Sequence, residues 1–163
     1  MSKNIQNDMK VVVTGHRLHK LESYNHQWIK LAIHESLQKL QHIHGYIRGY
    51  VGMASGVDLW FCQSCIDLKI SYVACIPFDK QEDGMSYSDV QLRQYFINHA
   101  DCVRKVRNSW MVEEAEMGLI IWDGNKGGTH NVIQQLIERK KSFIWINPVS
   151  CIIWPCLINT DPI

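Results

Sequence analysis

The stretch KVVVTGHR, residues 10–17, joins a β-branched run to an abrupt glycine turn, and this combination decides the fold. Three valines followed by Thr14 and Gly15 are typical of a buried strand that stops at a tight connection. Residues 22–41 follow with apolar side chains at helical spacing. The opening of the chain therefore predicts a strand, a polar turn and a long helix.

The same alternation of short apolar runs and helical stretches continues along the chain. Further strands are predicted at 46–51, 71–76, 102–106, 118–122 and 143–147, and helices at 57–68, 88–99, 110–115 and 129–140. In the 88–99 helix the side chains expected to face inward are Leu92, Tyr95, Phe96 and His99. Strands that alternate with helices imply right-handed crossovers and a parallel sheet. The predicted class is α/β: a Rossmann-like three-layer sandwich with a mostly parallel sheet.

Composition indicates an ordinary soluble domain. The chain has 163 residues, 46% of them hydrophobic and 20% charged, with a formal net charge of +1. This balance favours neither nucleic acid nor an anionic membrane as a partner. Residues 1–9 are polar, which argues against a secretory signal, and no apolar run could span a bilayer. We expect a cytoplasmic protein without nucleic-acid or membrane partners.

Neither a metal site nor a resident cofactor is expected from the cysteines and histidines. Cys62 and Cys65 are spaced as C-x-x-C, but they fall inside a predicted helix and are interpreted as packing residues. His42 and His44 bracket one residue, and two ligands do not make a site. The six cysteines are expected to be free thiols.

Polar and glycine-rich turns follow the strongest predicted strands, so they gather at one edge of the sheet. Glycine lets a ligand approach the backbone, and the first turn of a helix offers unpaired N–H groups and a partial positive charge. Such turns bind phosphate or carboxylate groups. The predicted ligand-binding residues are Thr14, Gly15, His16, Arg17, Gly52, Met53, Ala54, Ser55, Gly56, Asp58, Pro77, Phe78, Trp122, Asp123, Gly124, Gly127, Gly128, Thr129 and His130.

Each of these residues also has a purely structural interpretation. Thr129 and Asp58 could cap their own helices, and a glycine turn could be only a tight connection. Trp122 and Phe78 could stack on a base or merely cover a strand end, and His130 could lie on a helix surface. Two glycine-rich turns at one sheet edge, together with an arginine, favour the functional interpretation.

Five motifs in order resemble the SLOG superfamily, and its YpsA-like branch in particular. They are Thr14–Arg17 (TGHR), residues 52–58 (GMASGVD), residues 76–78 (IPF), residues 111–112 (MV) and residues 122–129 (WDGNKGGT). The resemblance covers residues 10–148. It implies a Rossmann-like domain whose glycine turns bind nucleotides or nucleotide-derived ligands, with Gly127, Gly128 and Thr129 at the phosphate.

One departure from the superfamily pattern bears on catalysis. Its phosphoribohydrolase branch carries a glutamate three residues past the threonine of the second turn, whereas this chain has Val132 there. Cleavage of an N-glycosidic bond needs a placed carboxylate. The remaining candidates for such a catalytic group are Asp58, Glu82, Asp83 and Asp123.

Residues 1–148 are therefore predicted to form a nucleotide-binding domain, and residues 149–163 an apolar tail that packs on the domain or contacts another subunit of a homo-oligomer. Three functions stay open. The first is binding, for sensing or sequestration, of a nucleotide-derived ligand such as an ADP-ribose-type or cyclic nucleotide signal. The second is hydrolysis of a nucleotide N-glycosidic bond, and the third is a non-catalytic interaction role through the tail.

Overall fold

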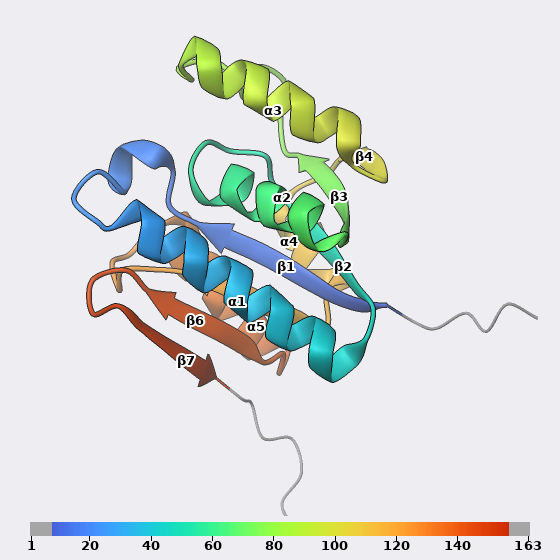
Figure 1. The fold of residues 1–163 in the computed structure, drawn as a ribbon, viewed down its shortest axis with the longest axis vertical. Coiled ribbons are helices and arrows are strands. Elements are labelled where there is room, and N and C mark those ends of the chain that lie inside the picture. The colour runs from blue at the N-terminus through green and yellow to red at the C-terminus, as the bar shows by residue number, and fades with distance from the viewer. Residues whose placement is uncertain (1–7, 157–163) are drawn as a thin grey trace, which may run out of the picture.

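The computed structural model describes residues 8–156, which form a seven-stranded sheet with helices on both faces (Figure 1). The strands are β1 (Met9–Gly15), β2 (Ile47–Val51), β3 (Ser71–Ile76), β4 (Cys102–Lys105), β5 (Met117–Ile121), β6 (Phe143–Asn147) and β7 (Ile152–Cys156). The helices are the 3-10 helix η1 (Leu18–Lys20) and the α-helices α1 (His26–His44), α2 (Val57–Leu68), α3 (Tyr87–His99), α4 (Asn108–Glu114) and α5 (Gly128–Glu138).

The strand order is β4-β3-β2-β1-β5-β6-β7, and every neighbouring pair is parallel except β6 and β7. Helices α1 and α2 cover one face of the sheet, and α4 and α5 lie behind it (Figure 1). Helix α3 packs against α2. The predicted α/β three-layer sandwich is therefore confirmed.

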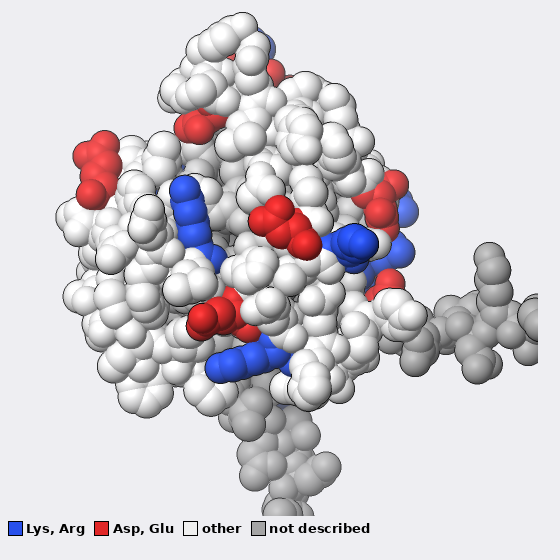
Figure 2. All heavy atoms as spheres, in the orientation of Figure 1, with Lys and Arg blue, Asp and Glu red and all other residues white. Residues whose placement is uncertain are grey.

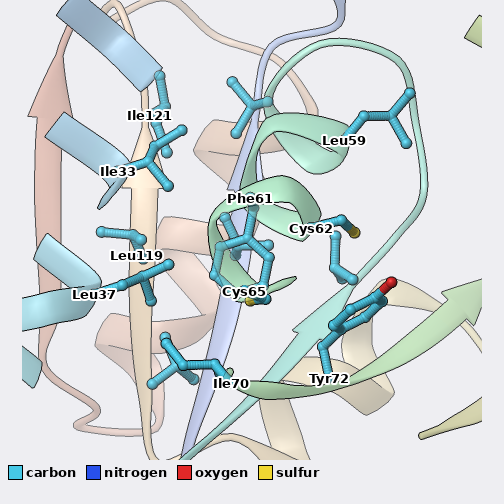
Figure 3. Packing of buried hydrophobic residues seen from close by; sticks show 14 of the residues in the cluster. Ile33, Leu37, Leu59, Phe61, Cys62, Cys65, Ile70, Tyr72, Leu119 and Ile121 are labelled. Carbon is cyan, nitrogen blue, oxygen red and sulfur yellow. The ribbon is translucent and has the colours of Figure 1, made fainter. Parts of the chain in front are cut away.

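The larger core lies between the sheet and the α1–α2 layer. Figure 3 shows Phe61, Cys62 and Cys65 of α2 beside Ile33 and Leu37 of α1, and all five side chains are fully buried. The two cysteines are free thiols inside this core, as expected for packing residues. A second, smaller cluster on the other face packs α4 and α5 against the sheet.

Helix α3 departs from its prediction. Of the residues expected to face inward, Phe96 is buried, but Leu92, Tyr95 and His99 are exposed. The inward position is instead occupied by Arg93, whose side chain is buried although it is charged. Hydrophobic periodicity fails here because a buried arginine has a polar partner, described below, that no periodicity reveals.

The apolar C-terminal segment forms an edge strand. Ile152–Cys156 is β7, antiparallel to β6, with Pro155 opposite Ile144. Proline is tolerated there because an edge strand has one side without ladder partners. Leu157 and Ile158, which belong to the same apolar run, and the rest of the predicted tail to residue 163 lie outside the described residues. Residues 1–7, on which the argument against a secretory signal partly rests, lie outside them as well.

The surface of the described part is mixed in charge. On the face that carries α1 and α2, acidic and basic side chains stand among many uncharged ones without forming a field of one sign (Figure 2). Within residues 8–156, no helix is both long enough and apolar enough to cross a membrane.

Candidate ligand-binding site

A cavity of about 640 Å³ opens at the carboxyl ends of the parallel strands. The loops that follow β1, β2, β3, β4 and β5 all contribute to its wall, and the central strand β1 lies between β2 and β5. The chain crosses to different faces of the sheet on the two sides of β1, so the cavity occupies the topological switch point of the fold, where open α/β sheets bind ligands.

The structure brings many of the predicted site residues together around this cavity. Those that line it are Thr14, Gly15, His16, Arg17, Gly52, Ala54, Asp58, Pro77, Phe78, Gly127, Gly128 and Thr129. Ligand contact by these residues remains a prediction, but their convergence from four separate segments of the sequence is a property of the fold.

Other predicted site residues do not line the cavity. They are Met53, Ser55, Gly56, Trp122, Asp123, Gly124 and His130. Met53 is fully buried in the core, where its sulfur lies 3.8 Å from the Cys62 thiol. Gly56, Trp122, Asp123 and His130 take part in the contacts beside the cavity that are described below.

Several lining residues were missed as site residues, namely His19, Lys20, Gln81, Arg107 and Lys126. Asn108 and Met111, which the sequence suggested for the far side of the pocket, also line the cavity. Lys126 stands inside the quoted turn between two glycine positions, so its place in that turn was an available signal. Gln81 and Lys20 carry no such signal, because they come from loops whose path only the tertiary structure defines.

The cavity is strongly cationic. Arg17, Lys20, Arg107 and Lys126 line it with permanent positive charges, and His16 and His19 lie among them. Within the described part of the chain, the only carboxylate in the lining is Asp58. A concentration of positive charge around one concave site favours an anionic ligand.

Asp58 sits in the first turn of α2, and its side chain is 9% exposed. Its carboxylate accepts a hydrogen bond from the backbone N–H of Ala54, with an N–O distance of 3.0 Å. Burial raises the pKa of Asp58 to about 7, against the opposing effects of this hydrogen bond and of the Arg17 charge. The one acid of the cavity is therefore partly protonated near neutral pH.

Gly56 has a structural role at the start of α2. It adopts a φ of 87°, a conformation that side chains with a Cβ rarely take. A Cβ at this position would lie 2.7 Å from the backbone nitrogen of Leu18. The glycine therefore lets the loop after β1 pass directly against the start of α2, which brings Arg17 and Lys20 to the cavity.

The glycines at the start of α5 face open space instead. A Cβ added at Gly127 or Gly128 would meet no atom within 4 Å, so the packing does not require glycine at either position. Gly127 is the N-cap residue, and no side chain caps this helix in the structure. The first N–H groups of α5 are thus left for solvent or for a ligand.

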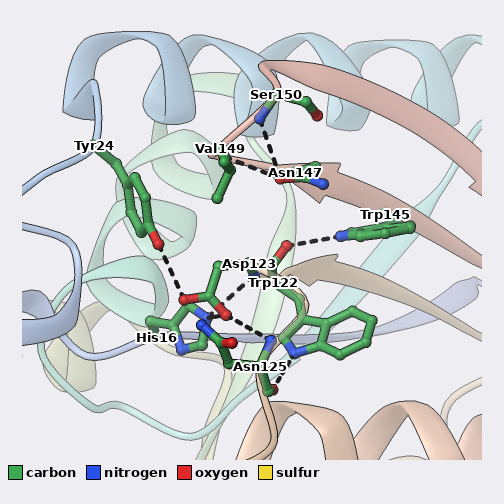
Figure 4. Close-up of polar contacts among 9 residues, drawn as sticks. All are labelled: His16, Tyr24, Trp122, Asp123, Asn125, Trp145, Asn147, Val149 and Ser150. Atoms are coloured by element: carbon green, nitrogen blue, oxygen red, sulfur yellow. Dashed lines mark hydrogen bonds and ion pairs between the residues drawn. The ribbon is translucent and has the colours of Figure 1, made fainter.

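Asp123 is held in a polar network beside the cavity. Its carboxylate accepts hydrogen bonds from the Tyr24 hydroxyl and the backbone N–H of Asn125, and it lies 3.0 Å from His16 Nε2 (Figure 4). Burial opposes ionisation, but the Asn125 N–H, the His16 charge and the Tyr24 hydroxyl together lower the pKa of Asp123. The carboxylate is accordingly ionised and occupied in positioning the turn after β5.

Trp122 belongs to an aromatic cluster outside the cavity. Its ring stacks on His130 with centroids 5.5 Å apart and packs against Trp145 at 5.3 Å. Its indole N–H donates to the Asn125 carbonyl, and its own carbonyl accepts from Trp145 Nε1 (Figure 4). These contacts are those of a residue that covers a strand end, while Phe78 is the predicted aromatic residue that lines the cavity.

The other carboxylate candidates lie elsewhere. Glu82 is 3.7 Å from Arg93 and, like Asp83, is absent from the cavity lining. Val132 is buried at 4% exposure in the core under α5. In residues 8–156 no group of three or more histidine, cysteine, aspartate or glutamate side chains could hold a metal ion.

Comparisons with known proteins support the fold. No family model matches the chain, and no curated protein matches it in sequence. Among solved structures, TM1055 shares 17% identity with a TM-score of 0.55, over 82% of this chain and 71% of that one. The molybdenum cofactor carrier protein of Chlamydomonas reinhardtii shares 11% identity with a TM-score of 0.57, over 85% and 76% of the two chains. At such identities the likeness concerns the fold alone, and that fold is Rossmann-like.

Proposed function

We propose that the cavity binds a nucleotide or a nucleotide-derived ligand, such as an ADP-ribose-type or cyclic nucleotide signal, and that the protein senses or sequesters it. One observation supports this proposal above all. The same cavity is lined by four basic side chains and by the start of α5, which has no side-chain cap. The basic residues are Arg17, Lys20, Arg107 and Lys126. Phosphate is the group that satisfies both, because it accepts hydrogen bonds from helix N–H groups and neutralises nearby charge.

The phosphate would lie between α5 and the loop after β1. Gly127 and Gly128 allow it to approach the backbone, and Thr129, Arg17 and Lys126 stand around the same place. Arginine adds two parallel hydrogen bonds to such an anion, which a point charge cannot do.

The less polar part of the ligand would lie toward β3 and β4. Pro77, Phe78 and Met111 line that part of the cavity, and Phe78 is 52% exposed. An exposed phenylalanine at a cavity offers a surface on which a base can stack. A volume of about 640 Å³ is within the usual range for a site that holds a small organic ligand.

Binding without chemistry is the function that these features support best. Hydrolysis of an N-glycosidic bond needs a carboxylate at the sugar. The α5 position of the superfamily glutamate is buried Val132, and Asp123 is already engaged by three partners. Asp58, the one carboxylate in the described lining, is held at the start of α2 by the Ala54 N–H and is the candidate on which the hydrolase alternative would rest. The C. reinhardtii neighbour is a cofactor carrier by name, which is an analogy for a carrier or sensor on this fold.

The test is calorimetric titration with AMP, cyclic AMP, ADP-ribose and inorganic phosphate. A ligand at about a hundred times its Kd should also raise the unfolding free energy by about 2.7 kcal/mol. Arg17→Gln should weaken nucleotide binding by about tenfold. Its matched control, Arg104→Gln, removes an exposed charge of β4 outside the lining and should leave affinity unchanged.

Two outcomes would contradict the proposal. One is the absence of binding by every nucleotide tested, and the other is equal weakening by Arg17→Gln and Arg104→Gln. Chromatography of the incubated nucleotides would detect released base, and its appearance would replace sensing by the hydrolase alternative.

Membership of the SLOG superfamily, a cytoplasmic location and self-association are further parts of this proposal. Self-association is supported by the exposed apolar side chains of Ile152 and Trp154 on the edge strand β7. Light scattering on the purified protein tests it. A monomer at all concentrations would overturn it without affecting the ligand site.

A further inference from the structure

Two buried hydrogen bonds in series lead from α3 to the wall of the cavity. Arg93 Nη2 donates to Gln81 Oε1 at 3.0 Å, and Gln81 Nε2 donates to the Gly52 carbonyl at 2.7 Å. Arg93 and Gln81 are each only 7% exposed, and both Gln81 and Gly52 line the cavity. A buried charge on one helix is therefore connected to the cavity through a single amide.

The orientation of that amide is fixed by its two neighbours. A guanidinium can only donate hydrogen bonds, so Gln81 must present its oxygen to Arg93. A backbone carbonyl can only accept, so Gln81 must present its nitrogen to Gly52. Turning the amide over would oppose two donors at one end and two acceptors at the other, and it would lose both hydrogen bonds.

Arg93 is costly to bury and is poorly paired by charge. Its Nη1 lies 3.7 Å from Glu82, whose side chain is 47% exposed. Its buried Nε has no hydrogen-bond partner in residues 8–156. An apolar residue would fill this position of α3 without the desolvation cost. Besides its long contact with the half-exposed Glu82, Arg93 provides a hydrogen bond that an apolar side chain cannot make, and this hydrogen bond orients Gln81.

We propose that Gln81 is a specificity-determining residue of the cavity and that Arg93 is its positioning residue. The amide nitrogen carries two hydrogens, and one of them is used by Gly52, so the other is the group that the amide offers to a ligand. Gln81 therefore selects a ligand whose uncharged part carries a hydrogen-bond acceptor beside Phe78. For nucleotides this means a base that presents an oxo group, rather than an amino group, at the position that faces Gln81.

This inference rests on the proposed function, and two nucleotide pairs test it. IMP and AMP differ by an oxo or an amino group on the purine, and UMP and CMP differ in the same way on the pyrimidine. Calorimetric titration should show that the wild-type protein prefers the oxo member of at least one pair by about tenfold, because the amino member opposes a donor to a buried donor.

Variants of the two residues separate orientation from packing. Gln81→Met keeps the side-chain volume and should bring the affinity ratio close to one. Arg93→Met leaves the amide free to turn and should also lower the ratio. Arg93→Lys still offers only donors, so it should preserve the preference. A purely structural role for Arg93 would change overall affinity or stability but not the ratio within a pair.

The outcomes distinguish the inference from the proposed function. If wild type binds none of the four nucleotides and neither cyclic AMP nor ADP-ribose, both the proposed function and the role of Gln81 fall. If it binds cyclic AMP or ADP-ribose but none of the four, the proposed function stands and the role of Gln81 is overturned. If wild type binds the four nucleotides but discriminates neither pair, prefers the amino member, or keeps its ratio in Gln81→Met, only the role of Gln81 is overturned. If circular dichroism shows that Arg93→Met does not fold, the comparison of Arg93→Lys with Gln81→Met decides the matter.

Discussion

The α-helices of this protein begin in two different ways. Helices α1 and α3 start away from the cavity, and each is capped by a side chain, Asn25 and Ser86 respectively. Helices α2, α4 and α5 start beside the cavity, and in the described structure none of them has a side-chain cap. The first N–H groups of a helix are thus capped by a side chain where the helix starts away from the cavity. Where a helix starts beside the basic residues of the cavity, no side chain caps these N–H groups.

The largest expected effect concerns Asp58, at the start of α2. Its folded pKa of about 7 lies above the ordinary value of 3.8, so the folded state holds the proton more tightly than the unfolded state. The contribution of Asp58 to the unfolding free energy should be highest below about pH 4 and fall as pH rises to about 7. The fall should be up to about 4 kcal/mol, since one pKa unit corresponds to about 1.4 kcal/mol.

Urea denaturation from pH 4 to pH 8 measures this slope. Asp58→Asn should flatten it, whereas Asp67→Asn, which changes an exposed acid near the end of the same helix, should not. If the unfolding free energy of Asp58→Asn changes with pH as it does in the wild type, then Asp58 is not the source of the pH dependence, and the start of α2 is as accessible to solvent as the start of a capped helix.

The next two predictions distinguish the glycine at the start of α2 from the glycines at the start of α5. Gly56→Val combines a positive φ with a Cβ against the Leu18 backbone, so it should cost about 3 kcal/mol of unfolding free energy. Chemical denaturation measures it. A loss below about 0.5 kcal/mol would show that the loop after β1 can move away and that the close approach does not position Arg17.

Gly128→Val should change ligand affinity much more than stability, in contrast to Gly56→Val. Because its side chain would enter open space, the unfolding free energy should change by less than about 1 kcal/mol. Nucleotide affinity should fall by about a hundredfold, since the methyl groups occupy the place of the phosphate. Asn131→Val, an exposed position of the same helix outside the cavity, is the control. Similar affinities for the two variants would remove the start of α5 from the site.

The smallest effect tests the capped class. Asn25 accepts a hydrogen bond from the Trp28 N–H at 3.0 Å, and Asn25→Ala should lower the unfolding free energy by about 1 kcal/mol. It should leave nucleotide affinity unchanged in a parallel titration. A change in affinity would show that a side-chain cap away from the cavity also influences ligand binding, and it would contradict the division between capped and uncapped helices.

Much of the fold could be read from local pattern. The valine run, the glycine turns and the periodic helices gave α2 and β3 with the bounds that the structure shows. Buried parallel strands have apolar runs because both faces are covered, and this signal is strong in the middle of the sheet. It is weaker at the edge, where β7 was read only as an apolar tail because Pro155 interrupts it.

The site was less predictable because its residues are close together in the folded structure but not regularly spaced along the sequence. Gln81 and Lys20 reach the cavity through loops that no periodicity describes. Asp123 and Trp122 follow β5 in the expected place, but Tyr24, His16 and Trp145 hold them beside the cavity. Sequence shows which strand end a residue follows. It does not show which way the side chain turns, since partners distant in sequence decide that.

The central position of β1 in the sheet has a consequence for how the protein folds during synthesis. On one side Val11 pairs with Gly49, but on the other side it pairs with Met117, on the order of a hundred residues later in the sequence. During synthesis β1 must therefore wait, with one edge unpaired, until β5 has been made. Nascent chains that stop before β5 lack the Lys126–Thr129 wall of the cavity, so a ligand of the proposed site should act late in folding, by stabilising the completed sheet.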